Sequence, residues 1–325
     1  MKMHRIIVYS LLVFCVSLCT HTLNAQTTKK QTPKLEVNPD AVNFIVMGDW
    51  GRNGEDHQKP VAAQMGKVAA AASVDFIIST GDNFYPLGVI SEFDPSWKYS
   101  FEDIYTAFSL QWDWYPVLGN HDYGSNPDAQ VAYSKISRRW RMPSRYYSKK
   151  FVLNGDTTQQ LLIAFIDTNP FLKDFYTNSN YGPNVKSQDS TAQKVWLKSV
   201  LGDPSPNIKW KLVVGHHPMF TGSDKRREGY DTRNIRSSLK KLMEEYQVDA
   251  YLAGHDHSLQ HIVVDGLNHF VSGAASEATQ VGRLPQSKFA MSRYGFMLFS
   301  ATANGILIQA IDEHGVVLYR TELKK

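Results

Sequence analysis

Short apolar segments alternate with longer amphipathic stretches along most of this chain. The apolar segments are rich in Val, Ile and Phe, which predicts buried β-strands. The predicted strands span residues 42–47, 74–79, 115–118, 161–166, 211–214, 250–252, 269–271, 295–300 and 306–311. The amphipathic stretches repeat their apolar residues every three or four positions, which predicts helices. The predicted helices span residues 60–72, 97–108, 129–140, 192–201 and 232–246.

This alternation of strands and helices is typical of a layered α/β fold. The last strands follow one another without helices between them, which indicates a second sheet packed on the first. The expected fold class is therefore α/β, with two packed mixed β-sheets flanked by helices. The chain has no internal repeat, so we expect one catalytic domain over residues 41–325, after a polar linker over residues 26–40.

The first 25 residues predict a secretory signal peptide. A short basic region precedes the apolar run of residues 6–19, and the small residue Ala25 ends the segment. The run is shorter than the ~20 residues needed to span a bilayer. We therefore expect cleavage, no stable membrane span, and a product that is periplasmic or secreted. Cys15 and Cys19 are the only cysteines, so the processed chain would have no disulfide.

Composition and charge narrow the function classes. The chain has 325 residues, of which 42% are hydrophobic and 20% charged, which is typical of a folded protein with a large core and excludes disorder. The net charge is only +4, and the chain has no long run of Lys and Arg. Nucleic acid is therefore not the expected partner.

Five glycine-containing segments follow directly after predicted strands. They are residues 48–51, 81–85, 119–122, 215–218 and 254–257. Glycine allows the backbone to turn sharply and to present the next side chain. In open α/β sheets the carboxyl edge of the strands is where ligands bind. We therefore expect the polar side chains of these segments to meet at one sheet edge.

Taken singly, these polar residues are ordinary. An Asp or Asn after a strand is commonly a turn residue, and a lone His is commonly a hydrogen-bonded one. Together they offer carboxylate, amide oxygen and imidazole without sulfur, a donor set that suits Fe, Mn or Zn. His255 and His257 lie two residues apart, so on an extended segment they point the same way and can serve neighbouring ions. Two ions roughly 3.5–4 Å apart can hold both sides of a phosphoryl group during displacement.

The order of the five segments resembles that of the calcineurin-like metallophosphoesterases. Most members have Asp-x-His in the first segment, whereas this chain has Asp49-Trp50-Gly51 and carries Tyr85 three residues after Asp82. This exchange is similar to the purple acid phosphatases, in which a tyrosinate binds ferric iron. Residues 81–85, 88–89, 101–104, 132–137 and 251–260 resemble the small tartrate-resistant type, and the resemblance extends from about residue 42 to the C-terminus.

The resemblance implies a secreted acid phosphatase that hydrolyses phosphate monoesters at a dinuclear metal centre. The implied ligands of Fe(III) are Asp49, Asp82, Tyr85 and His257. The implied ligands of a divalent ion (Fe, Zn or Mn) are the bridging Asp82, Asn120, His216 and His255. The implied nucleophile is a metal-bound hydroxide. His121 is the implied general acid. The neighbouring Asp122 either orients His121 or caps a helix.

Several questions stay open at this point. His217 has no assigned role, and the basic residues 225–227 either attract phosphate or form a solvated loop. The implied substrates are small phosphate esters, with phosphoproteins as an open alternative. A phosphodiesterase or pyrophosphatase would use the same metals. A redox role for a reducible iron pair and a non-catalytic phosphate-binding protein are the competing functions from other classes. The oligomeric state is not indicated.

Overall fold

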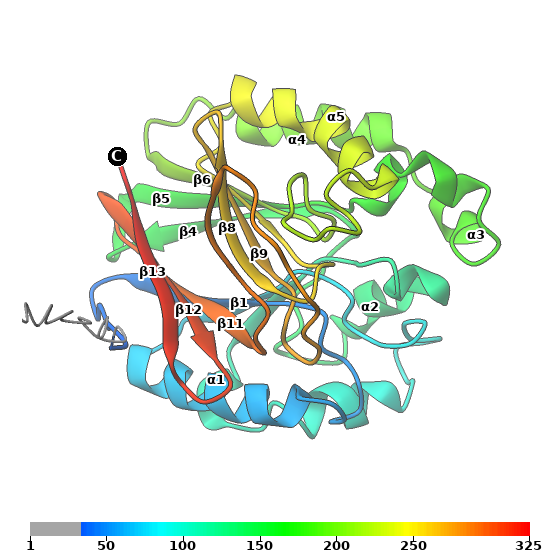
Figure 1. Cartoon of the computed structure of the whole chain (residues 1–325), viewed down its shortest axis with the longest axis horizontal. Coiled ribbons are helices and arrows are strands. Elements are labelled where there is room, and N and C mark those ends of the chain that lie inside the picture. Colours follow the sequence, from blue (N-terminus) through cyan, green and yellow to red (C-terminus); the bar gives the residue numbers. More distant parts are fainter. Residues whose placement is uncertain (1–33) are drawn as a thin grey trace, which may run out of the picture. The chain divides into compact units, whose positions relative to one another are not determined.

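The computed structural model describes residues 34–325, and two β-sheets dominate this part of the chain (Figure 1). The predicted signal peptide, residues 1–25, lies outside the described residues, as do residues 26–33 of the predicted linker. Residues 34–325 belong to one compact unit. None of the helices in residues 34–325 is long and apolar enough to cross a bilayer.

The first sheet has six strands and joins the beginning of the described chain to its end. Its strands β1, β2 and β3 are parallel, and β11 pairs antiparallel with β1, so that Ile45 lies opposite Leu298. The strand β1 is buried on both faces, which explains its continuous apolar sequence. The order is β13 (Val317–Lys324), β12 (Gly305–Asp312), β11 (Gly295–Ala301), β1 (Val42–Met47), β2 (Phe76–Ser79) and β3 (Asp113–Pro116).

The second sheet has seven strands and comes from the middle of the chain. Its central strands β5, β6, β7 and β9 are parallel, while β4, β8 and β10 pair antiparallel with their neighbours. The order is β10 (Ser287–Met291), β8 (Leu259–Val264), β9 (Leu267–Ser272), β7 (Ala250–Ala253), β6 (Ile208–Val214), β5 (Asp156–Phe165) and β4 (Tyr147–Leu153).

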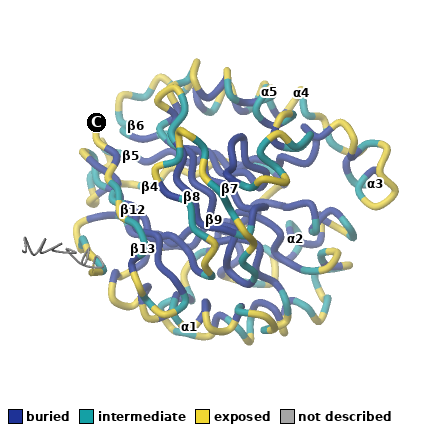
Figure 2. The backbone as a smooth tube through the Cα atoms, in the orientation of Figure 1, coloured by how far each residue is buried: buried dark blue, intermediate teal, exposed yellow. Residues whose placement is uncertain are grey.

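The core lies between the two sheets. The ring of Phe76 in β2 stacks on that of Phe151 in β4 at 4.0 Å, and Phe270 in β9 contacts Phe299 in β11 at 5.5 Å. Each such buried side chain contributes about 1.5–3 kcal/mol to folding. Figure 2 shows the strands as the buried centre of this unit, with exposed residues along the helices and loops.

Helices cover the outer faces of both sheets (Figure 1). Helix α1 packs on β1 and β11 of the six-stranded sheet, and α4 packs on β5 of the seven-stranded sheet. The Asp189 carboxylate caps α4 by accepting the Thr191 and Ala192 N–H groups. The α-helices are α1 (Gln58–Ala72), α2 (Pro127–Tyr133), α3 (Gly182–Val185), α4 (Ser190–Leu201) and α5 (Tyr230–Glu245).

The predicted fold class is confirmed, but the membership of the sheets differs from our expectation. We expected the C-terminal strands to form the second sheet. Instead β11, β12 and β13 extend the first one, because β11 pairs with β1. Every predicted strand overlaps an observed one, whereas β4, β8, β10 and β13 were not predicted.

Two predicted helices are wrong in extent. Residues 97–108 form only a short π-helix, η1 (Trp97–Glu102), followed by turns and the 3₁₀ helix η2 (Phe108–Leu110). The helical spacing of Trp97, Phe101 and Tyr105 instead reflects packing in one aromatic cluster. The helix predicted over residues 129–140 ends at Tyr133, and Trp140 is buried in an extended segment that bridges to Trp114.

Candidate metal centre

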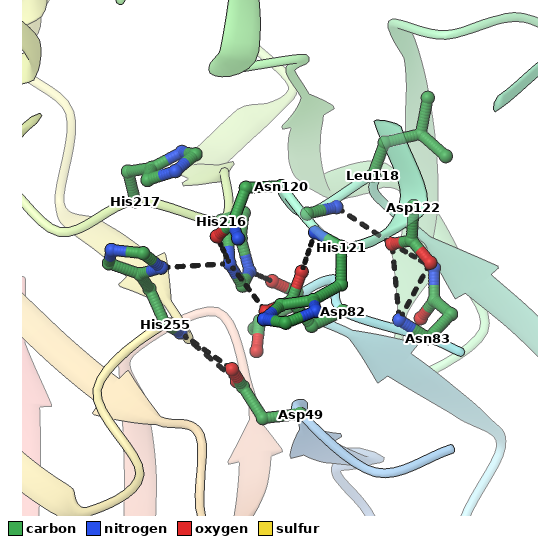
Figure 3. Close-up of polar contacts among 12 residues, drawn as sticks. Asp49, Asp82, Asn83, Leu118, Asn120, His121, Asp122, His216, His217 and His255 are labelled. Atoms are coloured by element: carbon green, nitrogen blue, oxygen red, sulfur yellow. Dashed lines mark hydrogen bonds and ion pairs between the residues drawn. The ribbon is translucent and has the colours of Figure 1, made fainter. Parts of the chain in front are cut away.

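The five glycine-containing segments end strands of both sheets, where we had expected a single sheet edge. Asp49, Asp82 and Asn120 follow β1, β2 and β3 of the six-stranded sheet. His216 and His255 follow β6 and β7 of the seven-stranded sheet. The carboxyl ends of parallel strands from the two sheets thus converge, and Figure 3 shows their side chains facing one another.

Three of the predicted ligands have an unusual backbone conformation. Asp49, Asp82 and His255 have φ angles of 61°, 48° and 68°, in the left-handed region that side chains disfavour. Residues held in such conformations cost on the order of 1–3 kcal/mol each and concentrate at functional sites. Three of them at one place indicate that the position of these side chains matters more than local stability.

Two glycines allow the carboxylates to approach the neighbouring loops. A Cβ at Gly119 would lie 2.1 Å from Asp82 Oδ1, and a Cβ at Gly254 would lie 2.5 Å from Asp49 Oδ2. Neither position accepts a side chain, so glycine is required by the close packing of the segments.

The first group of donors surrounds the phenol oxygen of Tyr85. That oxygen lies 3.2 Å from Asp49 Oδ1, from Asp82 Oδ2 and from His257 Nε2. A phenol has one hydrogen and can satisfy only one of these neighbours at a time. Four groups that can all donate electron pairs thus converge on one point.

The second group surrounds Nε2 of His216, which is fully buried. Asp82 Oδ2 and Asn120 Oδ1 each lie 3.3 Å from this nitrogen, and His255 Nδ1 lies 3.2 Å from it. His216 Nδ1 lies 2.8 Å from the Thr80 carbonyl oxygen. Because a carbonyl only accepts, Nδ1 carries a hydrogen, and Nε2 is the nitrogen that faces the group.

These two groups fit a pair of metal ions. Asp82 belongs to both groups through one oxygen, Oδ2, which lies 3.2 Å from the Tyr85 oxygen and 3.3 Å from His216 Nε2. Ligand atoms of Asp49, Asp82 and His216 lie within 4.8 Å of one another, as do those of His216, His217 and His255. Carboxylate, phenol, amide oxygen and imidazole donors without sulfur suit iron, manganese or zinc. These side chains offer more electron-pair donors than there are hydrogens to share among them, and bound cations would supply the missing positive partners.

The electrostatics of the protein groups support the same interpretation. Burial raises the pKa of Asp82, but the positive charge of His216 outweighs this effect, so the pKa lies far below its usual range. Burial lowers the pKa of His216, while the Asp82 carboxylate raises it, to a net value of about 9. Burial, together with the Asp82 and Asp49 carboxylates, raises the pKa of the Tyr85 phenol well above its usual value. A phenolate therefore forms here only beside a strongly charged cation.

His121 lies at the edge of these groups. Its backbone N–H donates to Asp82 Oδ1 at 2.8 Å, and its ring lies 4.4 Å from the ring of Tyr85. Its Nδ1 lies 2.6 Å from the Pro86 carbonyl oxygen and therefore carries a hydrogen. The side chain is partly exposed, so its Nε2 is accessible to a ligand at the metal centre.

Asp122 was predicted either to orient His121 or to cap a helix, and its contacts favour neither role. Its carboxylate accepts the Asn83, Phe84 and Gly119 backbone N–H groups at 2.8–3.2 Å. Asp122 thus joins the Asp82 segment to the Asn120 segment, and a backbone carbonyl orients His121 instead.

His217 and the basic loop now have defined surroundings. His217 is fully buried, its Nδ1 lies 2.8 Å from Thr168 Oγ1, and its ring lies 4.4 Å from that of His255. Arg226 donates to the His255 carbonyl oxygen at 2.6 Å. His217 thus packs against the ring of His255, and Arg226 holds its backbone carbonyl. The loop of residues 225–227 therefore borders the site.

Two carboxylates at this site were not predicted. Asp231 Oδ2 lies 2.9 Å from His255 Nε2, and Glu277 Oε2 lies 3.2 Å from His257 Nδ1. Each acid lies beside the ring nitrogen that points away from the candidate ions, and the hydrogen bond to Asp231 fixes the orientation of the His255 imidazole. Asp231 lies in the first turn of α5 and Glu277 lies in a loop after β9, so neither belongs to a motif that the sequence alone reveals.

Comparison with known proteins gives a consistent result. The family model for calcineurin-like phosphoesterases matches residues 42–259. Purple acid phosphatase 17 of Arabidopsis thaliana is 37% identical over 297 residues, which cover 86% of this chain and 83% of that protein. Tartrate-resistant acid phosphatase type 5 of Oryctolagus cuniculus is 33% identical over 313 residues, which cover 90% of this chain and 94% of that protein.

Solved structures show the same fold. GAP50, described as the anchor in the inner membrane complex of Plasmodium, has a TM-score of 0.73 and 26% identity, over 87% of this chain and 88% of its own. Purple acid phosphatase PPD1 from yellow lupin has a TM-score of 0.62 and 14% identity, over 90% of this chain and 55% of its own. At that identity the lupin structure supports the fold alone.

Proposed function

We propose a function that starts from the family of this chain, which belongs to the purple acid phosphatases among the calcineurin-like phosphoesterases and is thus a metal-dependent acid phosphatase. We propose that it hydrolyses phosphate monoesters at a dinuclear centre of Fe(III) and a divalent ion, with His121 as general acid. We also propose that it acts outside the cytoplasm after removal of residues 1–25.

The proposed ligands of Fe(III) are Asp49, Asp82, Tyr85 and His257, and those of the divalent ion are Asp82, Asn120, His216 and His255. The convergence of Asp49, Asp82 and His257 on the Tyr85 oxygen, each at 3.2 Å, is the observation that carries this proposal. Two carboxylates and a phenol are hard donors that favour a highly charged ion. Because the pKa of Tyr85 is raised by its surroundings, a tyrosinate there needs such an ion.

The side chains of the chain divide the remaining tasks. A bound metal pair supplies Lewis acidity, which makes water a nucleophile and offsets the charge of the phosphoryl group. Asn120 is placed to donate a hydrogen bond from its amide nitrogen to a phosphate oxygen while its oxygen faces His216. His121, with Nδ1 held by the Pro86 carbonyl, would give the proton on Nε2 to the leaving alkoxide.

A visible absorption spectrum tests this assignment, because a tyrosinate bound to ferric iron is coloured. We expect a purple or pink band in the protein and its loss in Tyr85→Phe, with iron and a second metal measured in both. A colourless wild-type protein that hydrolyses phosphate esters would contradict the ferric assignment but not the phosphatase. A diester rate above the monoester rate would contradict the proposed substrate class.

Export is tested separately, by the N-terminus of the protein recovered from its native cells. A first residue at Gln26 would support the proposal. Full-length protein that begins at Met1 in the cytoplasm would contradict it.

A further inference from the structure

A cavity of about 410 Å³ opens beside the candidate metal centre, and His255 and His257 form part of its wall. The remaining wall comes from residues 223–226, Asp256, Glu277, Thr279 and Gln280. Its volume lies in the range of about 300–1,000 Å³ found for small-molecule sites. Because the two histidines belong both to the cavity and to the metal centre, a group bound in the cavity would adjoin a phosphate held at the metals.

Two cations border this cavity. The Lys225 side chain is exposed and makes no ion pair with any of residues 34–325. The Arg226 guanidinium is anchored by its Nη1, which donates to the His255 carbonyl at 2.6 Å and lies 3.5 Å from Asp256 Oδ1. Its other N–H groups are available to a ligand, since the side chain is 38% exposed.

The acids of the cavity are already balanced by other residues. Asp224 pairs with Arg227 at 2.9 Å, Glu277 pairs with Arg52 at 2.6 Å, and Asp256 pairs with Arg226 at 3.5 Å. The ammonium group of Lys225 is therefore the charge that lacks a counterpart. The cavity attracts an anion, and the anion has to be small.

We propose that this cavity binds a second phosphate group of the substrate. The enzyme then prefers small organic phosphates with two phosphate groups over the matching monophosphates. This inference rests on the proposed function, because the metal centre holds the phosphate that is cleaved. Ammonium and guanidinium donors together match the charge and the several oxygens of a phosphate better than those of a neutral group.

The test compares fructose 1,6-bisphosphate with fructose 6-phosphate on the metal-loaded full chain. We expect a higher kcat/KM for the bisphosphate in the wild type. Lys225→Glu lowers the ratio of the two kcat/KM values about tenfold, since a charged hydrogen bond is replaced by repulsion. Lys225→Arg keeps the ratio. Lys241→Glu makes the same charge change at an exposed position of α5 outside the cavity and keeps it as well.

The inference would be overturned if the ratio were unchanged in Lys225→Glu, or if it were lowered equally in Lys241→Glu. It would also be overturned if the kcat/KM for 3-phosphoglycerate, which offers a carboxylate as its second anion, equalled that for fructose 1,6-bisphosphate. If the wild type hydrolyses none of these esters, the proposed function fails instead. Calorimetric titration with fructose 1,6-bisphosphate then tests whether the cavity binds a phosphate group. Weaker binding to Lys225→Glu than to Lys241→Glu supports the inference, and equal binding to the two variants overturns it.

Discussion

Asp49 and Trp50 are neighbours in the sequence and are both fully buried, yet they belong to two regions built in opposite ways. Asp49 has a left-handed backbone and directs its carboxylate at Tyr85 and at the His255 backbone N–H. The side chain of Trp50 instead packs into an aromatic cluster next to the site. The boundary between the two regions thus falls within a single peptide unit.

The aromatic cluster is held together by packing alone. The Trp50 ring contacts those of Phe84, Tyr105 and Trp114 at 5.3–6.2 Å, and edge-to-face geometry dominates. The one polar atom of the Trp50 side chain, Nε1, donates to Ser79 Oγ at 2.8 Å. The Tyr105 hydroxyl is buried without a hydrogen-bond partner among residues 34–325, so ring packing is the main contribution of the cluster to stability.

The polar region, which consists of the two groups of candidate metal ligands around Tyr85 and His216, is not stabilised by packing in this way. Its carboxylates and imidazoles are buried, three of its residues have left-handed backbones, and its donors face one another. Such an arrangement is unfavourable until cations are bound. The difference suggests that the aromatic cluster offsets the cost of keeping the metal ligands in place.

The largest effect is expected from Trp50→Ala. Loss of this ring removes about 3–5 kcal/mol from the free energy of unfolding, because a large buried side chain is replaced by a cavity. Denaturant unfolding should show this loss equally with metals bound and after chelation. Tyr85→Phe, one layer above, serves as the control and should change the metal-free stability by no more than about 1 kcal/mol. A loss in Trp50→Ala that vanished on chelation would break the comparison.

The sequence predicted the buried parts of the fold better than its edges. The strand β1 has the predicted bounds of residues 42–47, since both its faces are apolar. The strand β4 was missed because it lies at the edge of its sheet and exposes Ser148, Lys149 and Lys150. The pairing of β11 with β1 joins residues some 250 positions apart, and no local pattern records such a contact.

The candidate ligands could be predicted because each follows a glycine or lies within a short motif at a strand end. Their mutual distances support the two groups that the family resemblance implied. Asp231 and Glu277 carry no such signal. They reach the site because helix α5 and a loop after β9 pack against it, which only the folded chain reveals.

A buried polar group outside the metal centre offers a second test, which uses pH. His269 in β9 is fully buried, and its Nε2 accepts the Met219 N–H at 3.0 Å. Burial, followed by the nearby His261, lowers the pKa of His269 from 6.5 to about 3. The unfolded chain therefore binds more protons between these values, and stability falls as the pH drops below 6.5.

We expect His269→Gln, which keeps an acceptor at this position, to lose less stability on acidification than the wild type. The difference should reach about 2–3 kcal/mol two pH units below 6.5. Thermal unfolding across that range measures it. The difference should be the same with and without metals. A dependence on metals would show that the sheet and the site are not separate regions.

The smallest effect, and the sharpest test of the boundary, is expected from Asp231→Asn. The carboxylate contacts Nε2 of His255, a proposed ligand of the divalent ion, at 2.9 Å. This contact fixes the ring so that the other nitrogen, Nδ1, faces His216. Its neutralisation should weaken binding of the divalent ion about 10- to 100-fold, as substitution of such supporting groups does. The colour of the ferric site should persist, because Tyr85 and His257 are not touched.

Metal content after dialysis against graded chelator measures this, with Asp249→Asn as the matched control. Asp249 has a similarly buried side chain, 16% exposed against 14% for Asp231, and pairs with Lys325 at the amino end of β7, whereas His255 follows the carboxyl end of that strand. Equal losses of both metals in Asp231→Asn would mean that the two groups of ligands act as one unit. Loss of the divalent ion alone would mean that Asp231 acts on its own group through His255, while His257 lies beside a separate carboxylate, Glu277. The asymmetry between the two ions would then lie in these unpredicted acids as much as in the ligands themselves.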